Sequence, residues 1–146
     1  MLALDCFDYP RHFDENNLKH PQDYTIQPTP IQPQYIVHER AGRRRLIFRA
    51  SWKIDSESYM PMSFIVDTGS VKPLYFSQEA LLALDQFGRL IECDLHSYVK
   101  FHYGDSNFDF TYAPAPCNII GLTALQQLGL SVSRNGFSFQ KAVRWI

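Results

Sequence analysis

Strict alternation of apolar and polar side chains over residues 46–54 is the feature that most limits the possible folds of this chain. The apolar positions are Leu46, Phe48, Ala50, Trp52 and Ile54, and the polar positions between them include Arg49, Ser51 and Lys53. Because successive side chains of a strand point to opposite faces, this pattern predicts a half-buried β-strand. A polar turn over 55–58 and a second apolar run over 59–66 complete a predicted hairpin, in which Pro61 favours an edge or a bulge.

Short extended segments interrupted by two small helices are expected in the rest of the chain. The further extended segments are 71–76, 90–93, 98–103, 107–112, 117–120, 130–133 and 137–140. An Asn-Gly pair at 135–136 predicts a tight turn between the last two. The helices are bounded by an N-capping Ser77 and a terminating Gly88, and by a capping box Thr123–Gln126 and a terminating Gly129. The pattern predicts an all-β, barrel-like fold with two short helices.

The composition indicates one folded domain preceded by an extension. The 146 residues are 45% hydrophobic and 14% aromatic, which is enough to build the core of a single domain. Five of the nine prolines fall before residue 34, and the stretch 21–33 also carries three glutamines, so it is expected to be extended and not helical. We therefore expect a partly ordered Pro/Gln-rich extension over 1–34 and a folded domain over 35–146.

Charge and hydropathy exclude several classes of function. The formal net charge is −1, so the chain lacks the basic excess of a nucleic-acid-binding protein, and no nucleic-acid partner is expected. No apolar run reaches about 18 residues and the N-terminal residues lack the features of a secretory signal, so no membrane partner is expected. The three cysteines, Cys6, Cys93 and Cys117, indicate reduced thiols in a reducing compartment such as the cytoplasm.

The segment 64–70, Phe-Ile-Val-Asp-Thr-Gly-Ser, carries the strongest chemical signal. Asp67 directly follows a buried strand, and a desolvated carboxylate needs hydrogen-bond donors or a functional reason to be there. Thr68 can fix a neighbouring backbone group, Gly69 permits a tight turn and lets its N–H approach the carboxylate, and Ser70 can donate a further hydrogen bond to it. The alternative is a strand that ends in an ordinary Asx turn.

A second segment, Asn118-Ile119-Ile120-Gly121, leads into Leu-Thr-Ala-Leu-Gln-Gln-Leu-Gly at 122–129. Together with the Asp-Thr-Gly segment, it resembles the retropepsin family of aspartic proteases from retroviruses, retrotransposons and their cellular relatives. In that family the apolar-apolar-Gly element packs beside the Asp-Thr-Gly loop. The resemblance covers about residues 44–140 and implies a closed, barrel-like acid-protease fold with one Asp-Thr-Gly lobe in each chain.

The same resemblance implies an aspartic endopeptidase that acts as a homodimer. A single Asp-Thr-Gly supplies one carboxylate, so the catalytic pair requires Asp67 from each of two chains, one acting as base on a water while the protonated partner polarises the scissile carbonyl. No metal or other cofactor is needed. Thr68 is expected to bond across the dimer axis, and Ser70 to favour the ionised carboxylate and a lower working pH. Substrates are expected to be extended peptides or a polyprotein, with the protease free-standing or a viral or retroelement product, cytoplasmic or virion-associated.

The sequence departs from the family at the expected dimer contact. Retroviral members usually carry an acidic residue two places after the Gly of Asp-Thr-Gly and an arginine after the later Gly. These positions hold Val71 and Leu122 here, an apolar pair in place of a buried ion pair. The retroviral form of dimer contact is therefore in doubt.

The expected flap over the substrate is short and lacks glycine. Its candidate tip is Asp94, Leu95, His96 and Ser97. Such a flap excludes water poorly, and the N-terminal extension is an alternative cover, as a lid or as a self-inhibiting strand. The C-terminal stretch 137–146 is a candidate for an interchain sheet. These departures motivate a rival interpretation, in which the fold serves as an interaction or structural module of a larger assembly with weak or no catalysis.

Two other signals favour ordinary structural roles. Cys93, His96, His102 and Cys117 have irregular spacing for zinc, so strand and core positions are the preferred interpretation. The basic run 43–45 is better explained as the solvated start of a strand than as a nucleic-acid contact.

Overall fold

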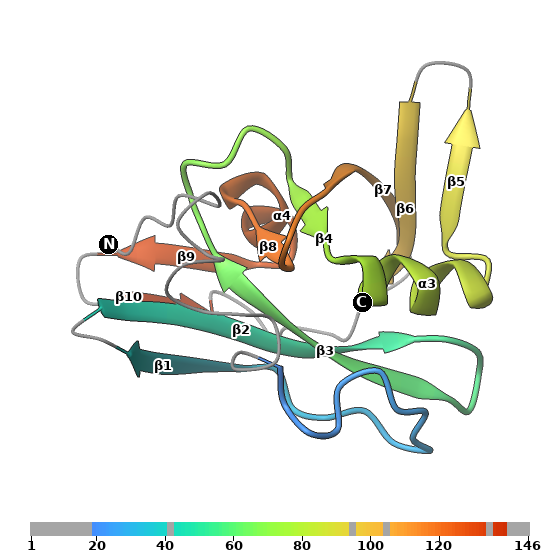
Figure 1. The fold of residues 1–146 in the computed structure, drawn as a ribbon, viewed down its shortest axis with the longest axis horizontal. Helices are drawn as coiled ribbons and strands as arrows, with labels where there is room; N and C mark the ends of the chain where they lie inside the picture. The colour runs from blue at the N-terminus through green and yellow to red at the C-terminus, as the bar shows by residue number, and fades with distance from the viewer. Residues whose placement is uncertain (1–18, 41–42, 94–95, 104–105, 134–135, 140–146) are drawn as a thin grey trace.

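The computed structural model describes residues 19–40, 43–93, 96–103, 106–133 and 136–139. This part of the chain forms short strands and two small helices (Figure 1). The strands are β1 (Gln34–Arg40), β2 (Arg43–Lys53), β3 (Tyr59–Val66), β4 (Leu74–Phe76), β5 (Leu90–Cys93), β6 (His96–Tyr103), β7 (Ser106–Pro114), β8 (Ile119–Ile120), β9 (Leu130–Ser133) and β10 (Gly136–Phe139). The helices are α3 (Gln78–Gln86) and α4 (Leu122–Gln127).

Eight of these strands form one open sheet in the order β1-β2-β3-β8-β4-β7-β6-β5, and β9 and β10 form a separate hairpin. The mostly β architecture is confirmed, but the expected closed barrel is wrong. The strands β1 and β5 are the two edges and do not pair with each other. Alternation along a strand records which face is buried, whereas closure depends on strand tilt and stagger across the whole sheet.

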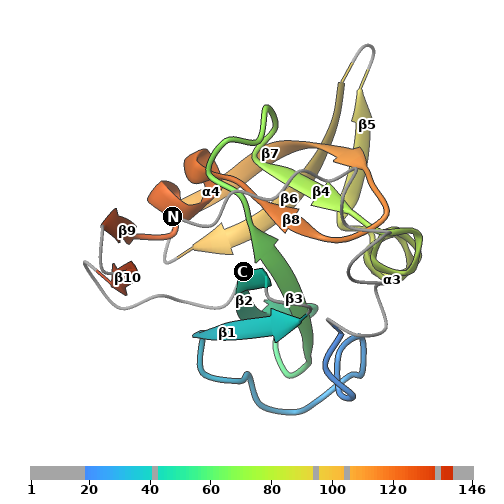
Figure 2. The ribbon, with the colours of Figure 1, turned by 60° about the vertical axis from the view of Figure 1, so that its left-hand side comes forward.

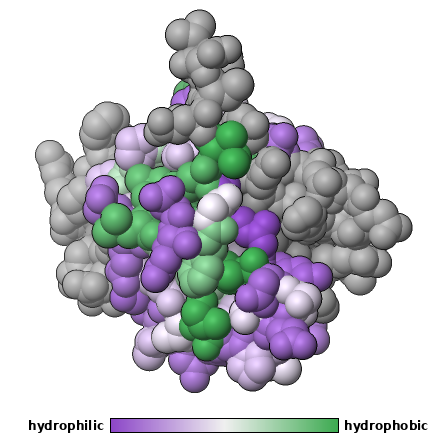
Figure 3. Space-filling view, turned by 90° about the vertical axis from the view of Figure 1, so that its right-hand side faces the viewer, coloured by the Kyte–Doolittle hydropathy of each residue, from purple (hydrophilic) through white to green (hydrophobic). Residues whose placement is uncertain are grey.

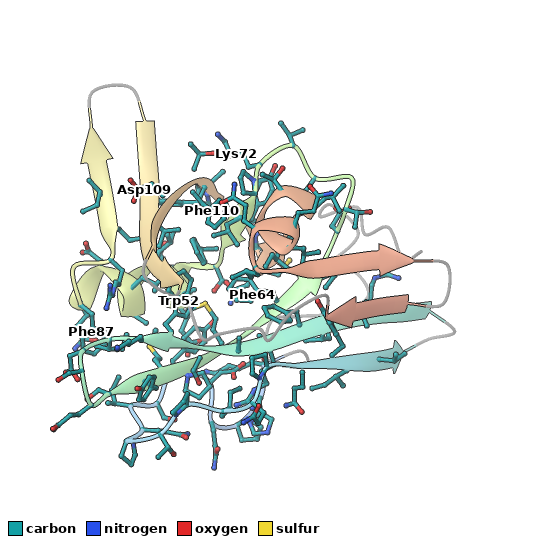
Figure 4. The ribbon with its side chains drawn as sticks, turned by 180° about the vertical axis from the view of Figure 1, so that it is seen from behind. Trp52, Phe64, Lys72, Phe87, Asp109 and Phe110 are labelled. Atoms are coloured by element: carbon teal, nitrogen blue, oxygen red, sulfur yellow. The ribbon has the colours of Figure 1, made fainter. Side chains whose placement is uncertain are left out.

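The hairpin of β2 and β3 supplies much of the main core, as its alternation predicts. Phe48, Ala50 and Trp52 are fully buried, and the register pairs Trp52 with Met60. Phe76 of β4 makes an edge-on contact with Phe64 across this core, with ring centroids 6.1 Å apart. Figure 4 shows Trp52 and Phe64 in the interior.

The other face of β2 is also buried, against expectation. Arg49 is 4% exposed and Ser51 is fully buried, although both were predicted to face solvent. A smaller apolar cluster on this face contains Ile47 and Ile65. The periodic pattern identifies the more apolar face but cannot show that a distant segment covers the polar one.

That covering segment is residues 19–33, which we call the N-terminal strap. Its Gln27 pairs with Tyr59 at the beginning of β3, and its Ile31 N–H donates to Ser51 Oγ over 3.0 Å. In Figures 1 and 2 the strap lies along the lower side of the β2–β3 hairpin. The described part of the Pro/Gln-rich stretch is therefore packed on the domain. It contains no helix, but residues 21–24 form a turn, so the expected extended backbone is wrong there.

The first helix begins and ends as predicted. Ser77 Oγ accepts a hydrogen bond from the N–H of Ala80 over 3.2 Å, which caps the N-terminus of α3. Gly88 has a φ of +68°, in the left-handed region where glycine avoids the strain of a side chain, and the helix ends before it. Figure 3 views the molecule from the side on which α3 lies, and on this side apolar residues are flanked by hydrophilic ones.

The second helix begins differently from the prediction. Helix α4 starts directly after Gly121, and no side chain caps it. Thr123 lies inside the helix, so the predicted capping box is wrong. The predicted stop is confirmed, because Gly129 has a φ of +84° after the last turn. No helix in the described ranges is long and apolar enough to cross a membrane.

Candidate functional site

The two motifs of the sequence meet where β3 and β8 run side by side. The strands are parallel, with Ile65 opposite Ile119 and Val66 opposite Ile120. All four side chains are buried. The N–H of Asp67 donates to the Ile120 carbonyl over 3.0 Å, so the strand pairing extends to the carboxylate-bearing residue. Segments more than 50 residues apart in the chain are therefore joined at Asp67.

The loop after β3 holds the Asp67 carboxylate by its backbone. The N–H of Gly69 donates to Asp67 Oδ1 over 3.0 Å, as the sequence predicts, and the N–H of Ser70 donates to the Asp67 carbonyl over 3.2 Å. Asp67 and Thr68 are both half-buried. A carboxylate at a chain turn, held by a backbone donor and partly accessible, can accept a proton from a bound water or present one to a ligand.

Ser70 has a different role from the predicted one. Its hydroxyl donates to the Lys72 carbonyl over 3.0 Å, so its single proton is not available to Asp67 in this arrangement. The loop is also tied to the second motif, because the N–H of Gly121 donates to the Pro73 carbonyl over 2.7 Å. This loop replaces the first half of the predicted extended segment 71–76, and β4 begins only at Leu74.

Asn118 joins three parts of the fold through one buried side chain. Its Oδ1 accepts the Ser77 N–H over 2.9 Å, and its Nδ2 donates to the Ser63 carbonyl over 3.2 Å and to the Tyr24 hydroxyl over 2.8 Å. The sequence placed Asn118 beside the Asp67 loop but not the contact with Tyr24. These two residues are 94 positions apart, so no local pattern links them.

The apolar pair expected at the dimer contact is not buried within one chain. Val71 is 93% exposed and Leu122 is half-buried. Val71 lies on the same loop as Asp67, and Lys72 next to it is half-buried. Figure 4 shows Lys72 near the top of this loop, above Phe110.

The predicted flap is a hairpin of β5 and β6. Its last described pair is Cys93 with His96, and Ser97 pairs with Glu92, so His96 and Ser97 are strand residues and not part of the tip. Residues 94–95 lie outside the described part. Strand β6 therefore begins two residues earlier than predicted, because cross-strand hydrogen bonding overrides the weak local preference of these residues. The hairpin projects from the body of the molecule (Figures 1 and 2).

The other candidate residues have the following positions. Within the described residues, no group of three or more His, Cys, Asp or Glu side chains is arranged to hold a metal ion. Cys117 is a buried free thiol. Arg45 is only 6% exposed, so the predicted solvated start of β2 is wrong at this position. Residues 140–146, most of the stretch proposed for an interchain sheet, lie outside the described part, and 136–139 pair with β9.

Comparisons with protein-family models, curated proteins and solved structures gave no match to this chain.

Proposed function

We propose that this protein is a retropepsin-type aspartic endopeptidase that acts as a homodimer. The observation that carries the proposal is the parallel pairing of β3 with β8, which joins the Asp67 N–H to the Ile120 carbonyl and sets Gly121 against Ser70 and Lys72 of the same loop. The resemblance of the two sequence motifs implies this juxtaposition, and an isolated Asx turn requires no such partner.

The chemistry requires a second chain. One Asp67 carboxylate can act as a base but cannot also supply the acid for the carbonyl oxygen. When two carboxylates share a site, their like charges prevent both from ionising, so the pair retains one proton. The ionised carboxylate takes a proton from water, the resulting hydroxide oxygen bonds to the scissile carbonyl carbon, and the carbonyl oxygen receives the proton of Asp67 of the partner subunit. Asp67 then gives the proton that it took from water to the amide nitrogen, while the ionised Asp67 of the partner subunit takes a proton from one hydroxyl of the gem-diol. The C–N bond breaks, which releases a carboxylic acid and an amine and leaves one proton on the pair.

The surroundings of Asp67 suit this role. The Gly69 N–H donates to Asp67 Oδ1 over 3.0 Å, which limits rotation of the carboxylate. The exposed Val71 on the same loop gives a second chain an apolar contact close to the axis. Strand β5 is an edge of the sheet, so its outer side offers backbone groups to an extended peptide, which would bind as an added strand.

The test is cleavage of a mixed peptide library between about pH 4 and 7 at high protein concentration. Wild type, Asp67→Asn and Asp109→Asn are compared, because Asp109 is an exposed carboxylate of β7 outside the loop and serves as the matched control. We expect cutting by wild type and Asp109→Asn and none by Asp67→Asn.

If all three proteins are folded and none cuts the library, the protease proposal is overturned and the interaction or structural module is favoured. Cutting that persists in Asp67→Asn would also overturn it, because the activity would then come from another group. Sedimentation of the same samples reports whether active protein is dimeric.

A further inference from the structure

The N-terminal strap is fixed to the domain by a buried ion pair. Arg49 Nε lies 3.0 Å from Asp23 Oδ1, and the two side chains are 5% and 1% exposed. The other oxygen of Asp23 accepts the N–H of His20 over 3.1 Å. A charge pair this far from water holds its two segments together firmly, since separating them leaves an uncompensated buried charge.

Tyr24, the next residue, is held in an unfavourable backbone conformation. Its φ is +66°, and it is the one non-glycine residue of the described part with a positive φ. Its N–H donates to the Pro61 carbonyl over 2.9 Å, and its hydroxyl accepts the Asn118 Nδ2 hydrogen bond over 2.8 Å. A bulky residue keeps such a conformation only where its surroundings impose it, and such strain gathers near functional sites.

From Asn118 the contacts continue to Asp67. The carbonyl of Asn118 accepts the Ile65 N–H over 2.9 Å, which begins the β3–β8 pairing. Two residues later, the Ile120 carbonyl accepts the Asp67 N–H. Tyr24 is therefore linked to the backbone of Asp67 through one side chain and one short strand.

We propose that the strap is a brace for the Asp67 loop and that Tyr24 is a positioning residue for the reaction. This inference rests on the proposed protease function for its effect on catalysis. It differs from the lid or self-inhibiting strand expected from the sequence. Strap residues pair with the beginning of β3 at Tyr59 and Pro61, whereas Asp67 follows its end. Figures 1 and 2 show the strap and the 67–73 loop on opposite sides of the molecule.

Amide hydrogen exchange of the full chain tests the brace independently of activity. Tyr24→Phe removes the oxygen that accepts the Asn118 hydrogen bond and keeps the ring. Thr25→Val is the control, because its hydroxyl donates to the Gln22 carbonyl and accepts from Gln27 Nε2, both within the strap. We expect Tyr24→Phe to accelerate exchange at the amides of Asp67 and Gly69 about fivefold, as expected for one net hydrogen bond. The amides of the β6–β7 ladder in Tyr24→Phe, and those of Asp67 and Gly69 in Thr25→Val, should keep their wild-type rates.

A general loss of stability would accelerate the β6–β7 amides equally, and a strap without influence would accelerate none. Either result overturns the brace. These exchange rates do not depend on catalysis. They therefore test the brace even if the Asp67→Asn experiment shows that the chain is not a protease.

Cleavage of the strap separates a brace from an inhibitor. A specific protease site is inserted between Gln32 and Pro33, and the intact protein is compared with cut protein from which the fragment carrying the strap has been removed. A brace predicts faster exchange at Asp67 and a lower kcat after the cut, with KM changed less. A rise in activity, or unchanged exchange at Asp67, overturns the proposal.

Discussion

Gly121 packs against Ser70 so closely that a β-carbon at position 121 would lie 2.4 Å from Ser70 Oγ and 2.9 Å from the Lys72 carbonyl oxygen. The φ of Gly121 is −95°, which any residue adopts, so glycine is required here by space and not by backbone conformation. This contact joins the two sequence motifs and fixes the distance between the Asp67 loop and the start of α4.

Gly121→Ala is expected to lower the free energy of unfolding by about 1–3 kcal/mol, because one added methyl group must displace backbone of the Asp67 loop. Chemical denaturation measures the shift. Gly69→Ala is the control: its β-carbon would lie 3.6 Å from Asp67 Oδ1, an ordinary contact, so a smaller shift is expected. Equal shifts in the two variants would contradict the close packing.

Asp23→Ala is expected to destabilise the protein by about 3–5 kcal/mol, because it leaves the buried Arg49 charge without its partner. The double variant Asp23→Leu with Arg49→Met should recover most of this loss. Lys19→Ala is the control at a less buried pair, since the ion pair of Lys19 with Glu79 is partly solvated and should contribute less than about 1 kcal/mol. A small effect of Asp23→Ala in urea denaturation would mean that the pair is accessible to water.

Asn118→Leu is expected to reduce the free energy of unfolding by about 2–4 kcal/mol, because the Ser77 N–H and the Ser63 carbonyl lose their side-chain partner. Thermal and urea unfolding give the value. Gln126→Leu, an exposed change on α4, should stay within about 0.5 kcal/mol of wild type. A similar loss of unfolding free energy in both variants would contradict the contribution assigned to the Asn118 hydrogen bonds.

Ser70→Ala is expected to leave the position of the pH optimum of cleavage unchanged, because the Ser70 hydroxyl donates to the Lys72 carbonyl and not to Asp67. Stability should fall by about 1 kcal/mol for the lost hydrogen bond. A pH–rate profile measured on both proteins is the check. A higher pH optimum in the variant would instead support the hydrogen bond from Ser70 to Asp67 that the sequence predicts.

The turn after β2 is expected to give a pH-dependent contribution to stability. The Glu57 N–H donates to Asp55 Oδ1 over 2.8 Å, and this hydrogen bond lowers the pKa of the Asp55 carboxyl below its usual value. A lowered folded-state pKa stabilises the fold above the unfolded-state pKa, about 3.9, and this contribution is lost as the pH falls through the folded-state value. The difference in melting temperature between wild type and Asp55→Asn should therefore narrow from about pH 5 to pH 2. A constant difference would contradict this assignment.

Features set by neighbouring residues were predictable. Helix α3 was located by Ser77 and Gly88, and the β2–β3 hairpin by its alternation. The Gly69 donor to Asp67 was also predicted, because it lies two residues away. The hydrogen bond of Ser70 was assigned wrongly at almost the same separation. Its actual acceptor is the Lys72 carbonyl, two residues ahead, and the Ser70 hydroxyl lies where position 121 has no room for a β-carbon.

The sequence by itself determined most of the strands that follow β1, the first helix and the candidate carboxylate, because periodicity, capping and turn chemistry act over a few residues. It did not predict β1. Only the tertiary structure decided that the sheet is open, that Arg49 is buried under the strap and that Tyr24 meets Asn118. Such contacts join residues tens of positions apart, and their stability depends on how all the segments pack and exclude water together. No short pattern in the chain records that collective free energy.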